Sequence, residues 1–147
     1  MATTLTDLID TLGSSLHSYL VAASVWTFPG AEAIKLALVD LVNDQQSISD
    51  RAGRLLVERG GIAPRPAYPI HFTATHDADL GALLPRVLEG LHRQVSQLDR
   101  LIDAGSDADE IGLAREAREA TLQHGDALDE LAQRIAGPAG SSPAATK

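Results

Sequence analysis

The sequence contains no cysteine, which excludes disulfides, thiolate chemistry and cysteine-based zinc sites. Aromatic residues make up only 3% of the 147 residues, so the core must be built from leucine, isoleucine, valine and alanine. An aliphatic core of this kind favours helices packed on helices over a β-sandwich. The length is that of one ordinary domain with room for a substantial core.

Basic residues are also scarce, because 12 Lys and Arg stand against 20 Asp and Glu and give a formal net charge of -8. Such a chain is repelled by nucleic-acid phosphates and anionic membranes, so we expect neither as a partner. It remains compatible with cations, including metal ions. The N-terminus has no basic region and no continuous apolar run, and no stretch is long enough to span a membrane. We therefore expect a cytoplasmic protein.

Apolar residues recur at helical spacing in four segments, each of which is followed by glycine or proline. The predicted helices cover residues 6–26, 31–59, 77–104 and 108–136. Three prolines exclude a helix from the connection between the second and third segments, which runs from about residue 60 to 75. A connection of this length is typical of bundles that are not simply up-down-up-down.

These patterns predict an all-α fold, a four-helix bundle of two helical hairpins joined by a long crossover loop. We expect the bundle to occupy residues 1–136. Residues 137–147 are rich in Gly, Pro and Ser and low in apolar bulk, so we predict a disordered tail there.

Polar residues interrupt the apolar stripes at the middle of two predicted helices. His124 falls at the centre of the last stripe, and Gln45 interrupts the stripe of the second helix. A buried imidazole needs a hydrogen-bond partner, so the two side chains could bond to each other. In the alternative interpretation, His124 is a metal ligand in the bundle core, with Asp44 on the flank of the Gln45 face.

Two more histidines, His17 and His92, lie at the edges of their stripes, where an ordinary boundary position is the simpler interpretation. If helix rotation turns both inward, they would join Asp44 and His124 in an N3O set suited to zinc, iron or copper. Iron or zinc is the cofactor that this hypothesis predicts. The sequence has no glycine-rich phosphate loop and no nucleophile elbow, so we predict no catalytic residue.

Apolar residues also fall outside the core stripes of the first hairpin. They are Val21, Val25, Leu36 and Val39. Scattered exposed apolar residues are normal, but four on one hairpin indicate a second buried surface. Trp26 at the hairpin corner could anchor that surface. We therefore predict a homo-oligomer that forms through the first two helices.

Three features resemble the ferritin-like superfamily, especially the Dps-type mini-ferritins. They are the corner Trp26-x-x-x-Gly30, the run SDRAGRLLVERGG at residues 49–61, and Tyr68-Pro69 in the following loop. The resemblance covers most of residues 10–136. It implies a ferritin-like bundle and a cytoplasmic, often shell-forming oligomer that oxidises and stores iron.

The metal ligands of that family are largely replaced. Dps-type proteins place a histidine before the corner tryptophan, where this chain has Val25, and further ligands in the first half of helix two, where it has Lys35, Leu36 and Val39. Classical ferritins carry a Glu-x-x-His motif on helices two and four. The two most similar stretches of this sequence keep one of the two histidines and neither glutamate. They are Asp44-x-x-Ser47 and Thr121-x-x-His124.

Two hypotheses about function follow. The first is an oligomeric ferritin-like bundle with a metal-handling or stress-related role and a modified or lost ferroxidase site. The second is a non-catalytic interaction or scaffold protein that keeps the fold without metal. A DNA-protecting role is a third possibility, against which the acidic charge argues.

Overall fold

The computed structural model describes residues 3–23, 32–65, 67–69, 72 and 80–145. The regular structure in this part of the chain is entirely α-helical, with no strand, as the sequence predicts. Its five helices are α1 (Thr3–Gly13), α2 (Leu16–Ala23), α3 (Glu32–Glu58), α4 (Leu80–Ala104) and α5 (Ala108–Ala145). No helix among the described residues combines the length and apolar character needed to cross a membrane.

The first predicted helix is interrupted by Ser14 and Ser15, which separate α1 from α2. The Ser14 hydroxyl donates to the main-chain carbonyl of Asp10 at 2.6 Å, and Ser15 Oγ accepts the amide of Ser18 at 3.2 Å. Serine side chains compete with helical main-chain bonds in this way, and Ser15 acts as the N-cap of α2. The prediction of one continuous helix over residues 6–26 is therefore wrong.

A pair of glycines ends α3. Gly60 has a φ of 85°, its amide donates to the Val57 carbonyl at 3.0 Å, and the Gly61 amide donates to the Leu56 carbonyl at 2.9 Å. These two bonds form the Schellman arrangement that closes many helices. A Cβ at Gly61 would lie 2.5 Å from Leu56 Cδ1, so a side chain here would have to displace the buried Leu56 side chain. The predicted end of this helix is confirmed to within one residue.

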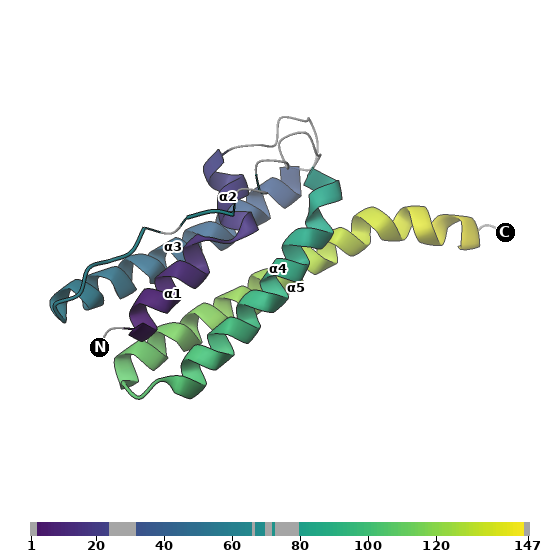
Figure 1. Cartoon of the computed structure of the whole chain (residues 1–147). Coiled ribbons are helices and arrows are strands. Elements are labelled where there is room, and N and C mark those ends of the chain that lie inside the picture. The colour runs from purple at the N-terminus through teal and green to yellow at the C-terminus, as the bar shows by residue number, and fades with distance from the viewer. Residues whose placement is uncertain (1–2, 24–31, 66, 70–71, 73–79, 146–147) are drawn as a thin grey trace.

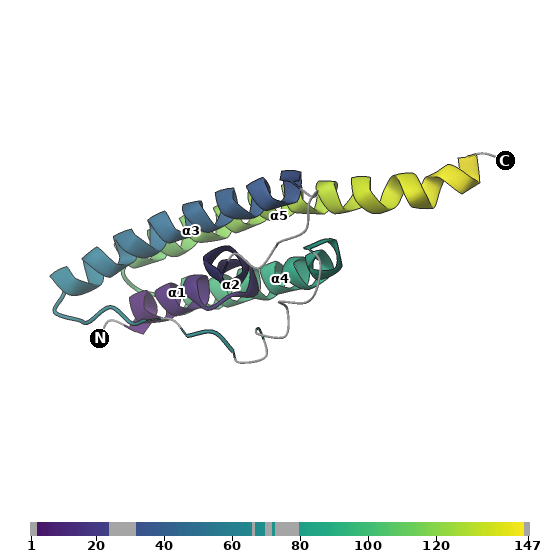
Figure 2. The ribbon, with the colours of Figure 1, turned by 90° about the horizontal axis from the view of Figure 1, so that it is seen from above.

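The helices form two layers, with α3 and α5 in one and α1, α2 and α4 in the other (Figure 2). Early residues of α3 and α4 meet in one apolar cluster, and Leu98 of α4 joins late residues of α3 in a second. These two helices therefore run in the same direction, and residues 61–65 and 67–69 after α3 lead back along the bundle (Figure 1). The remaining helices run the opposite way.

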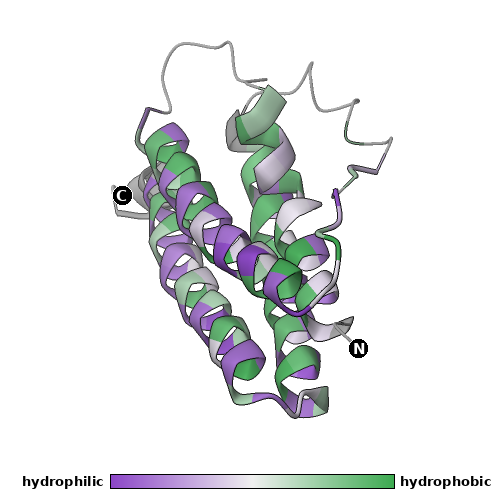
Figure 3. Cartoon of the chain, turned by 90° about the vertical axis from the view of Figure 1, so that its left-hand side faces the viewer, coloured by the Kyte–Doolittle hydropathy of each residue, from purple (hydrophilic) through white to green (hydrophobic). Residues whose placement is uncertain are grey.

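The buried core is accordingly divided into two apolar clusters. The α2-end cluster contains Leu16, Leu20, Ile34, Leu38, Leu41, Phe72, Leu83, Leu84, Val87, Leu91 and Leu128. The α1-end cluster contains Leu5, Leu8, Ile9, Leu12, Ile48, Ala52, Leu56, Leu98, Leu113, Ala114 and Ala117. Bands of hydrophobic and hydrophilic residues alternate along the long helices, as expected of amphipathic helices (Figure 3).

The last helix extends further than predicted. α5 continues to Ala145, whereas its apolar stripe predicted an end at Ala136, so that end is wrong. Its final turns project beyond the other helices (Figure 1). The division into a bundle over residues 1–136 and a disordered tail over residues 137–147 stays a prediction.

The residues predicted to form an oligomer interface differ in how far they are exposed to solvent. Leu36 is 66% exposed, Val39 is half-buried, and Val21 packs against the α2-end cluster. Val25 and Trp26 lie outside the described residues. Val21 thus belongs partly to the core, and oligomerisation stays a prediction.

The glycine cap generates a first prediction. Gly60→Ala should lower the free energy of unfolding by about 1 kcal/mol, because alanine is strained at positive φ. Gly112→Ala is the matched control. A Cβ at Gly112, inside α5, meets nothing within 4 Å, so this change should raise stability by about 0.5–1 kcal/mol. Urea unfolding measures both, and a Gly60→Ala variant as stable as the parent would contradict the cap.

Candidate functional site

A layer of buried polar side chains lies between the two apolar clusters. His17 of α2, Gln45 of α3, Gln94 of α4 and Thr121 of α5 are each at most 2% exposed. The sequence predicts a polar layer at mid-height centred on His124 and Gln45, and of these two residues only Gln45 belongs to it. The layer is the most polar part of an otherwise aliphatic interior, which makes it the first candidate for a functional site.

Gln45 stands at the centre of this layer because its side chain bonds to three other helices. Its Oε1 accepts a hydrogen bond from His17 Nε2 at 2.9 Å. Its Nε2 donates to Gln94 Oε1 at 2.6 Å and to Thr121 Oγ1 at 3.0 Å. An amide has one oxygen and two N–H donors, so every polar group of this side chain is used.

The network continues to main-chain groups at its edges. Gln94 Nε2 donates to the Thr11 carbonyl at 2.9 Å, and the Thr121 hydroxyl donates to the Ala117 carbonyl at 2.6 Å. Thr11 belongs to the last turn of α1, so the network links all five helices. We call this set of bonds around Gln45 the polar layer.

His17 is the only titratable member of the polar layer. Its Nε2 donates to Gln45, and its Nδ1 is buried without a hydrogen-bond partner among the described residues. Burial lowers the pKa of His17 to about 4, and the bond to Gln45 offsets this only in part. The imidazole is therefore neutral at pH 7. Its predicted place at the edge of the stripe is wrong, because the break before α2 changes the rotation of this helix.

His124 lies outside the layer, on the side of the bundle where α3 and α5 meet. Its Nε2 is 2.6 Å from Asp44 Oδ2, and the two side chains are 20% and 61% exposed. The buried stripe of α5 passes instead through Thr121 and Leu128. The predicted central position of His124 is therefore wrong, and so is its predicted bond to Gln45, since each residue has another partner.

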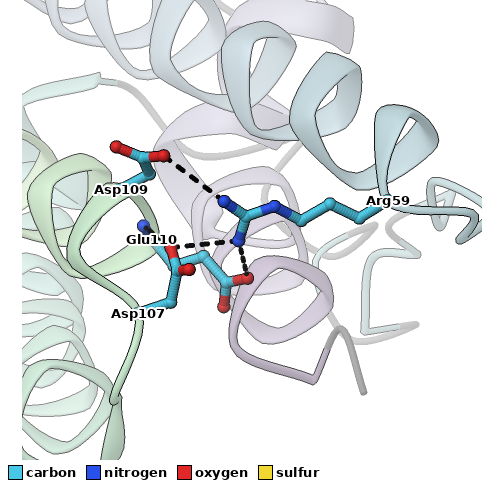
Figure 4. A network of polar contacts seen from close by, with 4 residues as sticks. All are labelled: Arg59, Asp107, Asp109 and Glu110. Carbon is cyan, nitrogen blue, oxygen red and sulfur yellow. Dashed lines mark hydrogen bonds and ion pairs between the residues drawn. The ribbon is translucent and has the colours of Figure 1, made fainter.

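Two further polar contacts lie along the same α3–α5 seam. Arg51 makes a two-pronged ion pair with Glu116, at 2.7 and 2.8 Å, and this hydrogen bonding lowers the pKa of Glu116. Directly after α3, Arg59 contacts three acidic residues at the start of α5 (Figure 4). Contacts nearer the end of α3 are made with residues nearer the start of α5, as antiparallel helices require.

The Arg59 cluster secures the start of α5. Arg59 Nη1 lies 2.6 Å from Glu110 Oε2 and 3.0 Å from Asp107 Oδ1, and its Nη2 lies 3.3 Å from Asp109 Oδ2. Asp107 Oδ1 also accepts the Glu110 amide at 3.0 Å, which caps the helix. Hydrogen bonding by Arg59 lowers the pKa of Asp107. These carboxylates are thus occupied in holding α5 against α3.

The four predicted metal ligands are not brought together. Asp44 and His124 meet, but His17 is buried in the polar layer and His92 is exposed on the outer face of α4. No group of three His, Cys, Asp or Glu side chains suited to a metal occurs in the described part of the chain. A ferritin-type di-iron site needs several carboxylates and two histidines from facing helices, and this donor set does not fit it.

Sequence reasoning missed Gln94 and gave Thr121 no role in the interior. The signal was available for Gln94, which interrupts the apolar stripe between Leu91 and Leu98 as Gln45 does between Leu41 and Ile48. Thr121 carried a weaker signal, because threonine is common in helices with its hydroxyl bonded to a preceding carbonyl.

Comparisons with protein-family models, with curated proteins and with solved structures found no match to this chain. The ferritin-like resemblance therefore rests on the sequence motifs alone.

The buried histidine predicts a pH dependence. Between pH 6.5 and about 4 the unfolded chain takes up a proton at residue 17 and the folded chain does not. The free energy of unfolding should therefore fall in this range as the pH is lowered, by at most about 1.4 kcal/mol per pH unit from this residue. Above pH 6.5 residue 17 is neutral in both the folded and the unfolded chain, so it causes no loss of stability there.

His17→Gln tests this directly, because glutamine keeps a donor for Gln45 and cannot titrate. Its urea-unfolding stability should fall less steeply than that of the parent between pH 6.5 and 4.5. His92→Gln is the control at an exposed position and should keep the parent slope. Equal slopes for the parent, His17→Gln and His92→Gln would contradict the lowered pKa of a buried His17.

Proposed function

We propose that the protein is a non-catalytic interaction or scaffold bundle whose polar layer holds the helices together and does not bind a metal. The observation that supports this is that every polar group of the Gln45 side chain is hydrogen-bonded to a residue of another helix. The layer contains one neutral imidazole, two amides and a hydroxyl, and no carboxylate. A divalent cation in such a neutral, buried set would have no charge to balance it.

We also propose that the chain has the four-helix, ferritin-like architecture that its motifs imply. If α1 and α2 are counted as one interrupted helix, the five helices form a four-helix bundle with a crossover between α3 and α4. In this proposal the family's metal ligands were lost and the mid-bundle positions were taken over by amides. A homo-oligomer through the exposed face of α3 around Leu36 belongs to the same proposal.

The metal-handling role is the second candidate, and the Asp44–His124 pair favours it. An imidazole and a carboxylate from two helices, 2.6 Å apart at an accessible position, are two of the ligands that zinc or iron needs. Water or a neighbouring subunit would have to supply the others. The pair is equally well explained as one of the three polar contacts along the α3–α5 seam.

Metal analysis of full-length protein, purified without a histidine tag or chelator, separates the two candidates. The scaffold proposal predicts well under one zinc or iron per chain, with or without His124→Ala. The control variant is His92→Ala, since His92 is exposed and distant from Asp44 in the fold. Stoichiometric metal that is lost in His124→Ala and kept in His92→Ala would overturn the scaffold proposal in favour of metal handling.

A further inference from the structure

An apolar groove lies on the outer face of the bundle, between α4 and α5. It is lined by Leu88, Leu91 and Val95 of α4 and by Thr121, Leu122 and Gly125 of α5. Its volume is about 180 Å³. Leu122 is 36% exposed, and Leu88 and Val95 are only half-buried. Apolar side chains are therefore open to solvent along two turns of α4.

A glycine of α5 borders the base of this groove. Gly125 has no side chain, and a Cβ there would lie 3.8 Å from Leu91 Cδ1, at the base of the groove. Glycine inside a helix costs about 1 kcal/mol relative to alanine. The missing side chain at Gly125 deepens the groove by about the space of one methyl group.

The α5 edge of the groove is acidic. Asp126 and Asp129 follow Leu122 at the spacing i+4 and i+7, so the three side chains lie along one edge of the helix. Asp129 accepts a hydrogen bond from Gln133, and neither aspartate forms an ion pair within the part of the chain that the structure describes. His92 lines the groove from α4. This edge therefore presents negative charge beside the apolar floor.

We infer that the α4–α5 groove binds an amphipathic helix of a partner protein, whose apolar residues are flanked by lysine or arginine. The inference rests on the proposed interaction role. A helix laid in a groove inserts side chains at i, i+3 or i+4, and i+7, which matches a floor spanning two turns. Cationic flanks complement Asp126 and Asp129, whereas a second copy docked symmetrically through its own α4–α5 face would bring the same two aspartates against them.

The probe is a synthetic helical peptide with leucines at i, i+4 and i+7 and lysines beside them, labelled for fluorescence anisotropy. A second peptide with the same leucines and glutamates in place of the lysines controls for charge. Full-length protein should bind the lysine peptide with one peptide per chain and bind the glutamate peptide at least about tenfold more weakly. Added salt should weaken only the first interaction.

Three variants locate the binding surface. Leu122→Ser should weaken binding of the lysine peptide about tenfold by removing the exposed leucine of the groove. The double variant Asp126→Asn with Asp129→Asn should weaken it several-fold and reduce its salt dependence. Val57→Ser, which removes a more exposed apolar side chain from α3, is the matched control and should bind as the parent does.

Equal binding of both peptides, or binding unchanged by Leu122→Ser, would overturn the inference. A dimer of the parent protein that dissociates in Leu122→Ser, measured by light scattering, would also overturn it by making a second copy the occupant. Either failure leaves the scaffold proposal standing if the protein is metal-free. Stoichiometric metal lost in His124→Ala would refute that proposal whatever the peptides do.

Discussion

The hydrogen bonds of the Gln45 side chain fix how the helices of this bundle meet. Leucine-rich stripes pack in several alignments at similar cost, whereas a buried amide bonds to only one arrangement of partners. Sliding or rotating α2, α4 or α5 against α3 would leave a buried polar group without a bond, at about 1–3 kcal/mol each. The two apolar clusters supply most of the stability, and the polar layer between them specifies the register.

The interruption of the first helix has a role in the same arrangement. It lets α2 turn His17 toward Gln45, and it places the Thr11 carbonyl of α1 where Gln94 donates to it. The α3–α5 seam then adds ion pairs that are partly exposed and individually weak. Apart from His17 Nδ1, the side chains of the polar layer bond to one another or to the main chain of the bundle. A partner would therefore contact the surface, where the α4–α5 groove leaves apolar side chains open to solvent.

Much of the fold follows from the sequence because apolar periodicity over some 25 residues is a strong signal. Gln45 was identifiable for the same reason, since a polar residue interrupted an apolar stripe. The partners were not, because a helical wheel gives neither the neighbouring helix nor the height of a residue against it. His17 was misplaced by assuming one helix through Ser14, and His124 by a stripe that in fact passes through Thr121.

The most direct test of this account is the stability of Gln45→Leu, with Gln46→Leu as its neighbour control, by urea unfolding at pH 7. Gln46 is exposed, and within the described residues its side chain bonds to Asp50 of its own helix alone. Gln45→Leu leaves His17 Nε2 and Gln94 Oε1 without this partner, so we expect the free energy of unfolding to fall by about 2–4 kcal/mol. Gln46→Leu should change stability by less than about 0.5 kcal/mol. A Gln45→Leu protein as stable as the parent would contradict the central role of the polar layer.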